Sequence, residues 1–118
     1  MKKLLTLEIG MGADVHGHDY TKAAVRAVSD AIRHSSLTLF YSYGHPDDMD
    51  IELTIAVPSP EQIDEKEVAK ALPYGNVAVR SVLGGLNDTG MGGAEDIVLA
   101  NALVKVWLDT SNHRLQLV

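Results

Sequence analysis

The segment from Gly10 to Asp19 concentrates residue types that could do chemistry. Its ten residues include three glycines, two histidines and two aspartates. Aspartate and histidine bind metal ions and transfer protons, and glycine lets a backbone approach a ligand closely. A loop that only joined two elements would not need this mixture. The sequence therefore places the candidate site in this segment.

The spacing of three of these residues is compatible with a metal site. In an extended backbone, alternate side chains project to the same side, so Asp14, His16 and His18 could converge on one ion. Zinc accepts nitrogen and oxygen ligands together, and manganese tolerates the same set. No fourth ligand is selected by the spacing. A divalent metal, zinc or manganese, is the cofactor that this interpretation predicts.

The same residues allow two further interpretations. Asp14 and His16 could form a catalytic acid–base pair, in which the carboxylate orients the imidazole ring and supports its protonation. The structural alternative is a tight turn between a strand and a helix. In that turn Asp19 would cap the helix and the histidines would be solvated.

The glycines indicate a ligand-binding role of a different kind. Glycines ahead of a helix N-terminus expose N–H groups to an anion, although Gly10 and Gly12 lack a third glycine at dinucleotide-binding spacing. A second glycine-rich loop, residues 84–95, could close over a ligand held by the first. The predicted ligand-binding residues are Gly10, Gly12, Gly17, Asp19 and Gly85.

The hydrophobic pattern predicts the elements that must position these residues. Residues 50–57 alternate cleanly between apolar and polar, as a half-buried strand does. Residues 97–108 read as a strand, with a helix as the alternative. The predicted order is strand 4–9, helix 20–34, strand 37–43, strand 50–57, helix 65–72, strand 77–83 and strand 97–108, with a short strand or tail at 114–118.

These elements predict one α+β domain spanning residues 1–118. It would be a two-layer sandwich in which both helices cover one face of a mixed sheet of four or five strands. Chorismate-mutase-like and ferredoxin-like arrangements both fit this order. The strand at 97–108 is apolar on both faces, so a second subunit is expected to cover the face without helices. The chain is therefore predicted to be a homo-oligomer.

Composition narrows the classes of function. The formal net charge is −6, and cationic residues are not clustered, which argues against nucleic acid as a partner. Cysteine is absent, so disulfides and thiolate chemistry are excluded. No apolar run is long enough to cross a membrane, and a cytoplasmic location is expected.

Two resemblances extend this interpretation. Residues 10–17 resemble the G-x-G-x-D-x-H-G signature of the Lin family of conserved hypothetical proteins, and the likeness continues through 21–28, 54–58 and 72–75. Residues 12–16 are also similar to the metal-binding segment of methylerythritol cyclodiphosphate synthase, a trimeric enzyme of the chorismate-mutase-like group. The first resemblance implies little about function, and the second implies a metal role for Asp14 and His16.

The resulting expectation is a small cytoplasmic homo-oligomer with a site at Asp14, His16 and His18. That site would bind a divalent metal and a small polar or anionic molecule, and the protein would act as a lyase, cyclase or hydrolase. The alternative is a protein without enzymatic activity that binds a ligand or serves in assembly.

Overall fold

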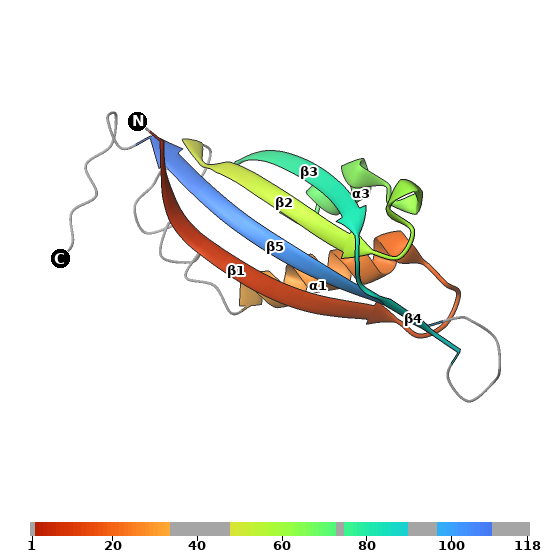
Figure 1. Cartoon of the computed structure of the whole chain (residues 1–118). Coiled ribbons are helices and arrows are strands. Elements are labelled where there is room, and N and C mark those ends of the chain that lie inside the picture. Colours follow the sequence, from red (N-terminus) through yellow and green to blue (C-terminus); the bar gives the residue numbers. More distant parts are fainter. Residues whose placement is uncertain (1, 34–47, 73–74, 90–96, 110–118) are drawn as a thin grey trace.

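The computed structural model describes residues 2–33, 48–72, 75–89 and 97–109. Its elements form one sheet with helices behind it (Figure 1). In chain order they are β1 (Lys2–Asp14), α1 (Tyr20–Arg33), β2 (Asp50–Val57), the 3-10 turn η2 (Pro60–Gln62), α3 (Glu65–Ala69), β3 (Asn76–Leu83), β4 (Leu86–Asp88) and β5 (Ile97–Asp109). None of the helices in these ranges is long and apolar enough to cross a membrane.

The sheet is mixed and has five strands. Its order is β1-β5-β2-β3, and the short strand β4 pairs with β5 beyond the end of β2. β2 and β3 run parallel and are joined through α3, while β5 is antiparallel to β1, β2 and β4. The last long apolar segment is therefore a central strand, with neighbouring strands along both of its edges.

The core lies between this sheet and α1. β2 and β5 contribute alternate side chains to it, from Ile51 to Val57 and from Val98 to Leu108, because residues two apart on a strand share a face. The helix contributes a stripe of small residues at helical spacing: Ala23, Ala24, Ala27, Val28 and Ala31. Both helices lie on this side of the sheet, so the other face is left without a covering element among the described residues (Figure 1).

This architecture confirms the predicted α+β two-layer sandwich. The strand predicted at 50–57 has the predicted bounds, and the helix predicted at 20–34 is present as α1 from Tyr20 to Arg33, with residue 34 outside the described residues. Residues 97–108 are a strand and not the alternative helix. The helix predicted at 65–72 ends at Ala69. The strand predicted at 37–43 and the terminal segment 114–118 lie outside the described residues.

The largest error in a predicted boundary is at the end of the first strand. The first strand does not end at residue 9 but continues to Asp14, so the first half of the predicted glycine-rich loop is strand. The remaining connection is short, residues 15–19. The second predicted loop also contains a strand, β4, between its first glycines and residue 89.

Candidate functional site

Gly10 and Gly12 bring β1 against α1. A Cβ atom added to Gly12 would lie 2.5 Å from the Ala23 carbonyl oxygen and closer still to the Ala27 backbone nitrogen. One added to Gly10 would lie 2.8 Å from the Ala31 Cβ, with backbone atoms of α1 closer. Glycine within a strand marks such a close backbone approach. Gly10 and Gly12, two of the four glycines predicted to bind a ligand, therefore face the helix.

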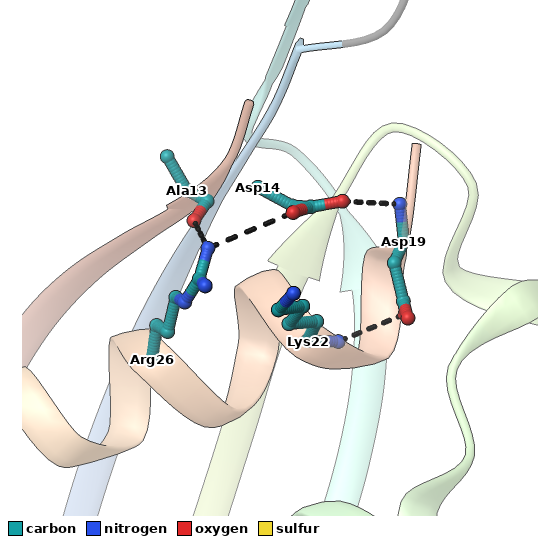
Figure 2. A network of polar contacts seen from close by, with 5 residues as sticks. All are labelled: Ala13, Asp14, Asp19, Lys22 and Arg26. Carbon is teal, nitrogen blue, oxygen red and sulfur yellow. Dashed lines mark hydrogen bonds and ion pairs between the residues drawn. The ribbon is translucent and has the colours of Figure 1, made fainter. Parts of the chain in front are cut away.

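Asp14, the last residue of β1, holds the start of α1 in place (Figure 2). The residue is only 2% exposed, and its Oδ2 atom accepts a hydrogen bond of 2.9 Å from the Asp19 backbone N–H. Its Oδ1 atom lies 3.6 Å from the Arg26 guanidinium, which also donates a 2.6 Å hydrogen bond to the Ala13 carbonyl. The buried carboxylate is therefore both hydrogen-bonded and charge-paired.

Asp19 is the N-cap of α1, as the sequence predicts. Its Oδ1 atom accepts a hydrogen bond of 3.0 Å from the Lys22 backbone N–H, the third residue of the helix. An N-cap side chain normally satisfies this free N–H. Asp14 and Asp19 together fix how the chain leaves β1 and enters α1.

His18, Tyr20 and Asn87 form a hydrogen-bonded chain beside this turn. The Tyr20 hydroxyl lies 2.9 Å from His18 Nε2 and accepts a 3.0 Å hydrogen bond from the Asn87 side-chain amide. The His18 and Tyr20 rings also meet edge to face, with centroids 4.9 Å apart. Residues from the connection between β1 and α1, from α1 and from β4 therefore converge. The second glycine-rich segment, which contains β4, thus reaches the first.

The two outer residues of this hydrogen-bonded series, His18 and Asn87, each have an unpartnered atom. His18 Nδ1 and Asn87 Oδ1 are inaccessible to solvent and find no hydrogen-bond partner within the described parts of the chain. Buried polar atoms are nearly always hydrogen-bonded, so each exception requires an explanation. His18 also has a positive φ of 54°, which is uncommon outside glycine. Backbone strain of this kind is concentrated at functional sites.

The other predicted residues occupy separate places. His16 is exposed in the connection that follows β1, and Gly17 beside it adopts a left-handed φ of 94°. Gly85, with a φ of 64°, makes the turn between β3 and β4. Across the described ranges, no three His, Asp or Glu side chains come together as a metal-binding group.

Sequence reasoning missed Tyr20, Asn87 and Arg26. The pattern showed Tyr20 only as the start of a helix and Arg26 as part of its polar side. Asn87 lies 67 residues from Tyr20 along the chain, and no local spacing joins them. The one available signal was the position of Asn87 in the second glycine-rich segment, which was predicted to approach the first.

Comparisons with known proteins agree with this fold. The model of the family described as "Conserved hypothetical protein (Lin0512_fam)" matches residues 4–106. A crystal structure described as an FtsZ-like protein of unknown function, from Nostoc punctiforme PCC 73102, is 38% identical in sequence, with a TM-score of 0.81. The alignment covers 92% of this chain and 97% of that one. No curated protein matches the chain.

Proposed function

The chain belongs to the Lin0512 family of conserved hypothetical proteins, and we propose that it binds a small polar molecule at the His18–Tyr20–Asn87 chain. The observation that carries this proposal is the pair of buried, unpartnered atoms, His18 Nδ1 and Asn87 Oδ1. Leaving a buried donor or acceptor unpaired costs about 1–3 kcal/mol, so a partner that reaches them gains that energy back.

The hydrogen bonds define the chemistry of the ligand. The Tyr20 hydroxyl already accepts from Asn87, so its own proton is available to His18 Nε2. In that arrangement His18 Nδ1 carries a proton and donates, while Asn87 Oδ1 accepts. The matching molecule presents a hydrogen-bond acceptor beside a donor, as a carboxamide does. Should it also be a substrate, the imidazole of His18 is a group that can take up and return a proton.

Acetamide and acetate test this assignment, because acetamide offers both a donor and an acceptor whereas acetate offers acceptors alone. Each is titrated into ¹⁵N-labelled protein while the side-chain amide of Asn87 and the backbone amides of residues 17–20 are followed by NMR. We expect saturable shifts that are larger with acetamide. The Tyr20→Phe variant, which keeps the buried ring and removes the hydroxyl, should lose them.

The matched control is Asn76→Ala, which removes an exposed amide bonded to Asp50 at the far end of the sheet. It should bind acetamide as the wild type does. Shifts that do not saturate, or that survive in the folded Tyr20→Phe protein, contradict the proposal. A high-resolution crystal structure with one ordered water bonded to both His18 Nδ1 and Asn87 Oδ1 would also contradict it, since the two atoms would then be satisfied.

A divalent metal is the second candidate ligand. The unpartnered Nδ1 atom of His18 favours it, because an imidazole nitrogen is a zinc ligand and the exposed His16 lies two residues away. Asp14 could join them only by leaving Arg26 and the Asp19 N–H. Protein purified without an affinity tag should then carry one zinc or manganese per chain, and the folded His16→Ala variant should lose it. A substoichiometric metal content in the wild type contradicts this candidate.

A further inference from the structure

The face of the sheet that the helices leave open is apolar along β1. Leu4, Leu7, Ile9 and Met11 alternate with the residues that face α1, and they are 43%, 46%, 67% and 55% exposed. The register places them beside half-buried side chains of β5, among them Leu103 opposite Ile9. Leu7, Ile9 and Met11 are at alternate positions, and the register shift between Leu4 and Thr6 keeps Leu4 on the same face, so the four side chains form a continuous stripe.

The size of the open face suits a protein partner. At about 3.3 Å per residue and about 4.8 Å between strands, the five described strands cover an area of about 700 Å². A stable interface buries about 800 Å² on each partner. A continuous apolar stripe rimmed by polar residues on a face of this size is typical of an interaction site.

The charges of the open face favour a second copy of the same chain. The whole chain carries a formal charge of −6, so two copies repel each other over most of their surface. The open face is different, because its cations and anions nearly balance. They are Lys2, Arg80 and Lys105 against Asp50, Glu52, Asp88 and Asp109. Interspersed charges of both signs allow a face to match itself across a symmetry axis.

We propose that the open sheet face, centred on Leu7 and Ile9 of β1, is the surface through which copies of this chain associate. The two sheets would pack face to face about 10 Å apart, as sheets do in other proteins, with the apolar stripes at the centre. This proposal is independent of the ligand site, because that site lies at the junction of α1 and β4 on the other side of the sheet.

The test is the mass of the protein in solution, measured by size-exclusion chromatography with light scattering over a range of concentrations. We expect the wild type to have a mass of at least two chains of 12.7 kDa. Ile9→Glu places a charge in the centre of the face and should reduce the mass to that of one chain. The substitution is expected to leave the fold intact, because Ile9 is 67% exposed within one chain. Met11→Lys is a second variant with the same expected loss.

The matched control is Leu83→Glu. Leu83 is 78% exposed, but it lies beside the buried residue Val57 and therefore belongs to the helix-bearing face of the sheet. The same change from an apolar residue to glutamate should leave the mass unchanged there. A wild type with the mass of one chain at every concentration overturns the proposal. So does a folded Ile9→Glu protein, or a folded Met11→Lys protein, that keeps the wild-type mass.

Discussion

The close contact between β1 and α1 predicts a large penalty for the smallest possible change, Gly12→Ala. The added Cβ would lie 2.5 Å from the Ala23 carbonyl oxygen and 2.6 Å from the Arg26 carbonyl carbon. Ordinary contacts of such atoms are about 3.5–4.0 Å. These atoms belong to the helix backbone, so no side-chain rotation relieves the clash. The helix must retreat by about 1 Å.

The magnitude follows from that retreat. Overpacking alone costs about 1–3 kcal/mol, and a gap of about 1 Å removes up to half of the dispersion energy of the contacts it opens. The alanine stripe of α1 packs along the whole interface, so its contacts are lost together. We expect Gly12→Ala to lower the free energy of unfolding by about 3 kcal/mol or more. That is a large share of the about 5–15 kcal/mol that stabilises a typical domain.

Urea unfolding followed by circular dichroism measures this loss, with every variant at one protein concentration because the proposed association would contribute to stability. Gly17→Ala is the matched control. Its Cβ would meet nothing nearer than Asp14 Oδ2, at 3.7 Å, so its cost of about 1–2 kcal/mol comes from the left-handed backbone alone. Adding Ala23→Gly to Gly12→Ala should not restore stability, because the clash is with a carbonyl oxygen. Rescue by that second change, or a Gly12→Ala loss no larger than that of Gly17→Ala, would refute the reasoning.

Three further predictions concern the polar contacts. Asp19→Ala removes the N-cap bond to Lys22 and should cost about 1 kcal/mol in urea unfolding, whereas Asp19→Asn should cost less. Asp14→Ala removes the acceptor of the Asp19 backbone N–H and the anion beside Arg26, and should cost about 1–3 kcal/mol by the same measurement. The Lys2 ammonium holds the pKa of Asp50 below its ordinary value, so this pair stabilises the fold above about pH 4, and the contribution is lost as the pH falls through the lowered pKa. The Asp50→Asn variant should show a weaker acid dependence of Tm than the wild type, and equal slopes would contradict this.

Much of the fold follows from periodicity. The alternation in residues 50–57 and the alanine-rich stripe of residues 20–33 each depend on a single period, and both predictions are confirmed. The error at the end of β1 has a physical cause. Gly10 and Gly12 resemble loop residues by composition, yet they lie in a strand. Glycine is needed at these two positions because a helix backbone passes too close for any side chain. Sequence alone does not report which backbone comes near a glycine.

Sequence analysis identified some members of the polar junction between β1 and α1 but not all of them. The segment of residues 10–19 does form a polar junction, and Asp14 and Asp19 are central to it. The sequence does not show that Asp14 contacts Arg26 and a backbone N–H, whereas its predicted metal and acid–base roles stay predictions. Tyr20 and Asn87 join the site through tertiary contact, which no spacing in the chain records.

The packing of α1 and the position of the site are physically coupled. Tyr20 is the first residue of α1, and its hydroxyl reaches both His18 and Asn87 only while the helix lies close against β1. Hydrogen bonds of 2.9 Å and 3.0 Å do not survive a displacement of about 1 Å. A retreat of the helix caused by Gly12→Ala should therefore weaken binding of acetamide as well as stability, although Gly12 touches neither His18 nor Asn87. Gly10 and Gly12 would thus act on the proposed site through the helix that they allow to approach.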